Sequence, residues 1–135
     1  MRLGDWESRL CEYIASVRDK PFAWGSHDCG MNFLNCCEAI TGVDPCPDWR
    51  GAYTTELGMA RAVRKRGHDT LESLMDSRFE AIPVGMVRRG DGVFNGDAIG
   101  ICMGSHALFV GQEGDGPDGL IRVPRSEWTK GWRVE

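Results

Sequence analysis

The residue with the clearest capacity for chemistry is Cys29, which follows an aromatic, glycine-containing loop and opens a predicted helix. A cysteine attacks as its thiolate, and a reference pKa of about 8.5 leaves only a small fraction charged near pH 7. The free N–H groups and the dipole of a helix N-terminus favour a negative thiolate and can hold an oxyanion. Asp28 opposes this, because a neighbouring carboxylate raises a thiol pKa. The position suits acyl transfer, although a cysteine at a helix start is more often a packing residue.

Two of the three histidines are candidates for the base that would take the thiol proton. His106 begins a predicted strand, and an antiparallel neighbour could carry it to Cys29; otherwise it is a polar residue at a strand edge. His27 lies in the loop two residues before Cys29, where it acts as a base or bonds the loop backbone. His68 follows a predicted helix stop and is expected in a surface turn.

The remaining cysteines raise the alternative of a metal site. Cys29, Cys36, Cys37 and Cys46 are separated by six, none and eight residues, whereas structural zinc sites prefer pairs two to four residues apart. Two adjacent cysteines on a helix also cannot face one point. We therefore expect no metal and no cofactor, and no disulfide framework, since no secretory signal precedes the chain. Most of the others should behave as small buried hydrophobes: Cys11, Cys36, Cys37, Cys46 and Cys102.

The first half of the chain has the periodicity of helices. Apolar residues at three- and four-residue steps predict a helix over 3–18, which ends at Pro21 because the residue before a proline avoids the α region. A second, buried helix is expected over 29–41, with Asp28 as its N-cap and Gly42 as its stop.

Two shorter helices should follow an irregular connection. The third starts at Thr54 or Thr55 and stops at Gly67. Asp69 and Glu72 resemble a capping box for a short fourth helix. These elements complete a helical part of about 1–78.

From residue 85 onward the pattern changes to short apolar runs separated by glycines, which predicts an antiparallel meander. The segment 111–119 predicts a long turn, and 124–128 one helical turn. The expected strands are 92–94, 98–103, 107–110, 120–123 and 132–134. The prediction is therefore one α+β domain, with helices packed on a small antiparallel sheet that occupies about 85–135.

Size and charge exclude several classes of function. A chain of 135 residues and 15.0 kDa forms one domain with one core. With a net charge of −4 and no basic stripe, a nucleic-acid partner is not expected. We interpret the one basic cluster as a solvated helix face rather than a phosphate site: Arg61, Arg64, Lys65 and Arg66. The longest apolar runs fall far short of the ~20 residues that a membrane span requires.

Three segments together resemble a known family. Residues 22–29, with the pattern Phe-x-Trp-Gly-x-x-Asp-Cys, are similar to the nucleophile segment of NlpC-type peptidases, a papain-like superfamily. Residues 89–94 resemble their entry into the first strand, and 97–104 their histidine-bearing second strand. The resemblance covers roughly 20–134. It implies a papain-like, NlpC-like single domain.

The resemblance implies roles for individual residues, with one departure. Cys29 stands at the nucleophile position, and Asp28 belongs to the loop and caps the helix. In the active peptidases a histidine opens the second strand, but the matching residue is Ala98, preceded by Asp97, and neither replaces an imidazole near pH 7. The loop residues expected near a substrate are Trp24, Gly25 and His27.

The pattern resembles in particular a branch carried by tailed bacteriophages and gene transfer agents, whose genes lie in the tail-tip region. The resemblance implies a virion protein assembled in the host cytoplasm and docked on tail-tip hub proteins, with degenerate catalysis. The alternative is a peptidoglycan endopeptidase or amidase that uses Cys29 during genome entry, with His106 or another group as base. An acyltransferase on a different substrate is also open.

Overall fold

The computed structural model describes residues 1–112, 116 and 118–135 of the chain. Its helices and strands form an α+β architecture, as predicted. The helices are α1 (Trp6–Val17), α2 (Cys29–Thr41), α3 (Glu56–Lys65) and α4 (Leu71–Arg78). The strands are β1 (Glu80–Ile82), β2 (Gly92–Phe94), β3 (Ile99–Cys102), β4 (His106–Gln112), β5 (Asp118–Pro124) and β6 (Lys130–Arg133). Three 3-10 turns join them: η1 (Pro47–Trp49), η2 (Val84–Met86) and η3 (Arg125–Glu127).

The strands form one antiparallel sheet in the order β1-β6-β2-β3-β4-β5. The predicted meander is correct for β2 to β5 but wrong for the last strand, because β6 pairs with both β1 and β2. Trp132 explains why β6 lies between β1 and β2. It is fully buried, and its ring lies 6.3 Å from that of Phe33 and 5.7 Å from that of Phe94. Strand β1 was not predicted, since it forms through pairing with β6 near the end of the chain.

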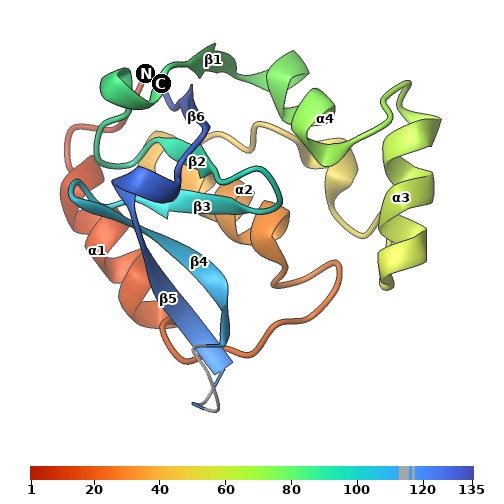
Figure 1. Ribbon diagram of the computed structural model, residues 1–135, viewed down its shortest axis with the longest axis horizontal. Coiled ribbons are helices and arrows are strands. Elements are labelled where there is room, and N and C mark those ends of the chain that lie inside the picture. The colour runs from red at the N-terminus through yellow and green to blue at the C-terminus, as the bar shows by residue number, and fades with distance from the viewer. Residues whose placement is uncertain (113–115, 117) are drawn as a thin grey trace.

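Helices α1 and α2 cover one face of the sheet. Helix α2 packs against both α1 and β3, and the Tyr13 hydroxyl of α1 donates to Asn32 Oδ1 of α2 at 2.7 Å. Figure 1 shows both helices behind the strands, with α3 on the far side of the molecule from α1 and the two termini side by side. The N-terminal segment is tied to the last residues by a bond from Arg2 Nε to the Val134 carbonyl at 2.8 Å.

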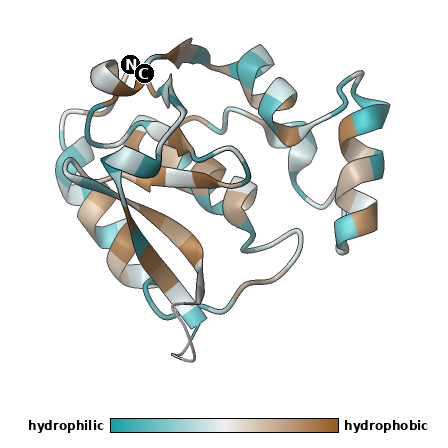
Figure 2. Cartoon of the chain, viewed as in Figure 1, coloured by the Kyte–Doolittle hydropathy of each residue, from teal (hydrophilic) through white to brown (hydrophobic). Residues whose placement is uncertain are grey.

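The two faces of the sheet contribute to two apolar clusters. Along β4, Leu108 packs on the larger cluster with α1 and α2, whereas Ala107 and Phe109 belong to a smaller cluster on the other face. That alternation is the two-residue period of a strand. Figure 2 shows the resulting apolar bands on β4 and β5. The smaller cluster is closed by Trp128, which is buried and donates its indole N–H to the Val123 carbonyl at 3.1 Å.

Most predicted helix ends agree with the structure. Thr55 caps α3 through its side chain, and Gly42 follows α2 in a left-handed conformation. The predicted capping box of the fourth helix is wrong: Thr70, one residue after Asp69, accepts from the Ser73 N–H as the cap. Glu72 instead pairs with Lys130 of β6 at 2.9 Å.

The predicted long turn is shorter than expected. Gly111 pairs with Gly119 and Gln112 with Asp118, so both strands of the hairpin extend into the segment that we predicted as a turn. Residues 113–115 and 117 lie outside the described residues. Among the described helices, none combines the length and apolar character needed to cross a membrane.

Candidate functional site

Asp28 organises the loop that precedes Cys29. Its carboxylate is 1 % exposed and accepts from the Met31 N–H at 2.8 Å and from the Gly25 N–H at 2.9 Å. The Tyr53 hydroxyl donates to the same carboxylate. One buried group therefore fixes the start of α2, the loop before it and the segment that leads to α3. The predicted cap role of Asp28 is confirmed.

Gly25 allows this loop to lie directly against the backbone at Tyr53. Its φ of +83° is in the left-handed region, and a Cβ added there would lie 2.1 Å from the Tyr53 carbonyl oxygen. No side chain fits such a contact. Gly25 thus has a structural role in placing Cys29, which accounts for its position whether or not a substrate approaches.

The Cys29 thiol is the first side chain of α2 and is half-buried. Burial is the largest influence on its pKa and raises it. The backbone N–H groups of Ile99 and Gly30 lower the pKa, while the carboxylates of Asp28 and Asp97 raise it, and the net shift is upward. The thiol is therefore protonated at neutral pH, and the helix N-terminus alone does not generate a thiolate.

The sulfur of Cys29 faces the start of β3. The Ile99 N–H lies close enough to lower the thiol pKa, and Ala98 is the residue directly before it. Asn95 holds this turn in place, because its Oδ1 accepts from the Ala98 N–H at 2.7 Å and from the Asp97 N–H at 2.9 Å. The backbone at the start of β3 therefore lies near the thiol, whereas the methyl group of Ala98 packs against the smaller cluster and cannot accept a proton.

His106, the first candidate base, does not lie at the start of β3, which the Cys29 sulfur faces. The Met103 N–H donates to the His106 carbonyl at 2.8 Å, and Cys102 pairs with Ala107, so His106 lies beside Met103. Met103 is four residues beyond Ile99, or about 13 Å along a strand. The β3–β4 hairpin is tight, and it therefore places the first residue of β4 next to the end of β3 rather than next to its start.

His27 is also excluded from substrate contact, because its side chain is completely buried. Its main chain closes the loop through a pair of bonds with Ala23, at 2.8 and 3.1 Å. Among the described residues, neither ring nitrogen has a hydrogen-bond partner, so the expected ring-to-backbone bond is absent. Burial, the largest cause, and the charge of Lys20 lower the His27 pKa, whereas Asp28 raises it.

Trp24 packs beneath the loop as a partly buried member of the larger core cluster. Its ring meets that of Phe22 edge-on, with centroids 4.8 Å apart, and Phe22 is 40 % exposed. Phe22 and Trp24 thus form an aromatic pair at the start of the loop. Sequence reasoning missed Tyr53 and Asn95, because nothing in their local pattern indicates contact with Asp28 or with the turn before β3.

The other cysteines do not form a second site. All six thiols are free, and within the described residues no group of three potential ligands could hold a metal ion. Burial raises the pKa of Cys36 to about 12. The expectation of burial holds for Cys36, Cys37, Cys46 and Cys102, but Cys11 is exposed on the outer face of α1.

The chain is an α+β protein in which a cysteine at a helix start faces the beginning of a strand. It belongs to DUF6950, a family described as a domain of unknown function, whose model matches residues 1–134. No curated protein and no solved structure matches the chain. The likeness to NlpC-type peptidases therefore stays a prediction that depends on the motifs of the sequence.

Proposed function

We propose that this protein is a tail-tip virion component of a tailed bacteriophage, with an NlpC-like fold whose catalysis is degenerate. The observation that carries the loss of catalysis is the environment of Cys29. The thiol faces the start of β3, where Ala98 occupies the position of the family's histidine, and its pKa is raised. A protonated thiol without a base neither attacks a peptide bond readily nor supplies a proton to the leaving amine.

The position of His106 supports the same conclusion. His106 begins β4 and lies beside the end of β3 that is opposite Ile99, so β4 does not bring its imidazole to the thiol. His27 is close in sequence but enclosed. The part of the proposed catalytic arrangement that remains is the loop before Cys29, held by Asp28 and Tyr53. These two residues also fix the start of α2.

The enzymatic alternative is a peptidoglycan cysteine endopeptidase or amidase. One observation favours it: the N–H groups of Ile99 and Gly30 are near enough to the Cys29 sulfur to lower its pKa. Such groups could stabilise a thiolate or an oxyanion once a substrate supplied further polar contacts. This alternative requires a base from the substrate or from solvent.

A digestion assay separates the two proposals. Wild-type protein and Cys29→Ala are incubated with purified peptidoglycan, and a known wall hydrolase is added to a parallel sample as a positive control. Equal inertness of both proteins supports degenerate catalysis. Release of peptide fragments by the wild type alone would establish the enzymatic alternative.

Alkylation of the native protein by iodoacetamide, mapped by mass spectrometry, tests the thiol directly. Exposed Cys11 is the internal reference, and Cys29 should react more slowly than Cys11 near pH 7 because its pKa is raised. Faster reaction of Cys29 would contradict degenerate catalysis.

The virion assignment is tested by mass spectrometry of particles purified from cells that express the chain. Its presence in intact particles at a fixed ratio to a tail protein supports the proposal. Its absence from particles that contain the remaining tail proteins would overturn the assignment.

A further inference from the structure

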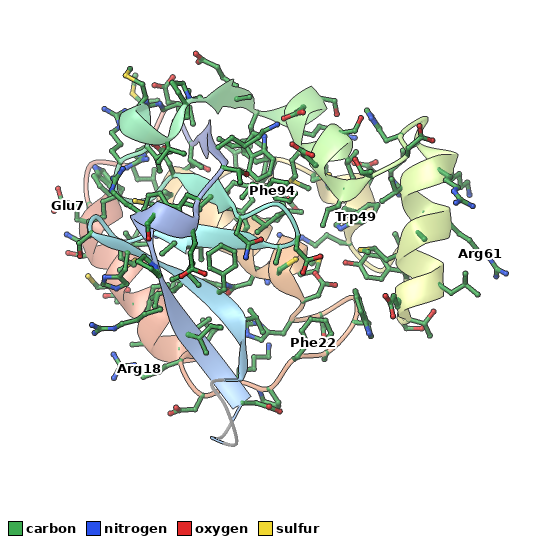
Figure 3. The ribbon with its side chains drawn as sticks, in the orientation of Figure 1. Glu7, Arg18, Phe22, Trp49, Arg61 and Phe94 are labelled. Atoms are coloured by element: carbon green, nitrogen blue, oxygen red, sulfur yellow. The ribbon has the colours of Figure 1, made fainter. Side chains whose placement is uncertain are left out.

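A pocket of about 530 Å³ lies between the end of α1 and the β4–β5 hairpin, and Cys29 does not line it. Its volume is within the range of sites that bind ligands. Four of its residues are apolar: Ile14, Met103, Leu108 and Leu120. Three carry basic side chains: Arg18, His106 and Arg122. Figure 3 labels Arg18 near the end of α1, beside the hairpin.

The register of the hairpin brings two of these residues together. Leu108 of β4 is directly opposite Arg122 of β5, so both side chains project from the same face of the sheet. His106 is two residues before Leu108 and projects from that face as well. The face therefore presents an apolar side chain flanked by two basic ones.

The backbone holds α1 against this hairpin. The Leu120 N–H donates to the Arg18 carbonyl at 3.0 Å. Gly119 permits the approach, because a Cβ there would lie 2.6 Å from the same carbonyl oxygen. Arg18 and Arg122 thus line one pocket through fixed main-chain contacts rather than through a flexible loop.

Both guanidinium groups lack an acidic partner within the described part of the chain. Arg18 and Arg122 make no ion pair and no side-chain hydrogen bond there, whereas Arg50 pairs with Asp44 at 2.9 Å and Arg66 with Asp48 at 2.9 Å. A planar guanidinium binds a carboxylate through two parallel bonds.

We propose that this pocket binds an acidic side chain on a segment of a partner protein, with the carboxylate at Arg18 and Arg122. Apolar neighbours of that side chain would cover Leu108 and Leu120. The mixed lining favours a protein segment over a nucleic acid, which requires a longer basic stripe. The edge of β5 is already bonded to Arg18 at Leu120, so a segment reaches the pocket over the exposed side chains of Arg18 and Arg122 rather than by pairing with that edge. The inference goes beyond the proposed function, since it holds whether or not Cys29 is active.

The test is a titration of the full chain, followed by amide NMR, with the peptides acetyl-Leu-Glu-Leu-amide and acetyl-Leu-Gln-Leu-amide. The glutamate peptide should shift the signals of Leu108, Leu120 and Arg122 and saturate in the millimolar range. The glutamine peptide should bind at least about fivefold more weakly, because a neutral amide does not form the charged pair.

Matched variants locate the site. Arg18→Ala and Arg122→Ala should each weaken binding of the glutamate peptide by about five- to tenfold. Arg122→Lys keeps the charge and should retain part of the affinity. Arg61→Ala removes an exposed arginine of α3 that lies outside this pocket and should leave binding unchanged. Unaltered amide spectra of the free variants exclude unfolding as the cause.

Three results would overturn the proposal. One is the absence of shifts at about 10 mM glutamate peptide, a concentration that detects even weak binding. Another is equal binding of the two peptides, which would indicate apolar contact without charge recognition. A third is inorganic phosphate binding at the same residues as tightly as the peptide, which would indicate a site for simple anions.

Discussion

The Cys29 thiol faces the backbone N–H of Ile99, and Ala98 is the residue directly before this start of the strand. Since Ile99 begins β3, this relationship joins the first residue of α2 to the first residue of that strand. Ala98 stands where the resembling family carries its histidine, and its own methyl group packs against the smaller apolar cluster.

Replacement of Ala98 by histidine should activate Cys29. An imidazole is longer than the methyl group of Ala98, and one that reaches the sulfur around the start of β3 accepts the thiol proton; a fall of one unit in the thiol pKa corresponds to about tenfold more thiolate. We expect iodoacetamide to alkylate Cys29 about tenfold faster near pH 7 in Ala98→His than in the wild type. Ala98→Gln is the matched control, because glutamine has a similar size but takes no proton. Equal rates in the two variants would show that position 98 does not reach the sulfur.

Loss of the Tyr53 hydroxyl should destabilise the loop. Tyr53→Phe leaves a buried carboxylate of Asp28 with one fewer donor, at a cost of about 1–3 kcal/mol in the free energy of unfolding. Urea denaturation measures the difference. Tyr13→Phe is the reference, since that hydroxyl donates to the uncharged amide oxygen of Asn32 and its loss should cost less. A smaller effect at Tyr53 than at Tyr13 would argue against a central role for Asp28.

The close approach at Gly25 should not tolerate alanine. Gly25→Ala adds a Cβ that would lie 2.1 Å from the Tyr53 carbonyl oxygen, in a left-handed conformation. We expect a loss of about 3 kcal/mol or more in the free energy of unfolding. Gly67→Ala isolates the conformational part, because Gly67 has a similar φ of +85° and nothing within 4 Å of an added Cβ. That variant should lose only about 1–2 kcal/mol, and equal losses would mean that the loop moves without strain.

Acid should destabilise the fold through His27. Its folded-state pKa is lowered, chiefly by burial, so the unfolded chain binds a proton that the native chain resists. The stability is complete above the unfolded pKa of about 6.5, and it is lost as the pH falls from there towards the folded pKa. The slope that His27 contributes is at most about 1.4 kcal/mol per pH unit.

The measurement is urea denaturation of the wild type and His27→Leu between about pH 7.5 and pH 5. Loss of stability on acidification should be smaller in the variant, whose apolar side chain does not titrate. His68→Leu is the control, since His68 is half-exposed and its Nδ1 lies 2.8 Å from Ser73 Oγ. Identical pH profiles for wild type and His27→Leu would contradict the assignment.

Local patterns predicted the helices and most of their ends well. The apolar period of α1, the cap at Asp28 and the stop at Gly42 depend on residues close together in the chain. Strands β2 to β5 were also predicted, because glycines separate their short apolar runs in the sequence. Strand β1 and the insertion of β6 beside β2 were not, since both depend on pairing between residues far apart in the chain, Glu80 with Arg133 and Gly92 with Trp132.

The sequence by itself determined that Cys29 opens a helix and that Asp28 caps it, and its resemblance to NlpC-type peptidases predicts that Ala98 stands where they carry a histidine. Only the tertiary structure decided which of the other groups reach the thiol. It places Ile99 beside Cys29, places His106 at the end of β3 opposite Ile99, and buries the side chain of His27. The reason is physical: a cap is a contact across three residues, whereas proximity across a sheet depends on strand register and on the packing that fixes it.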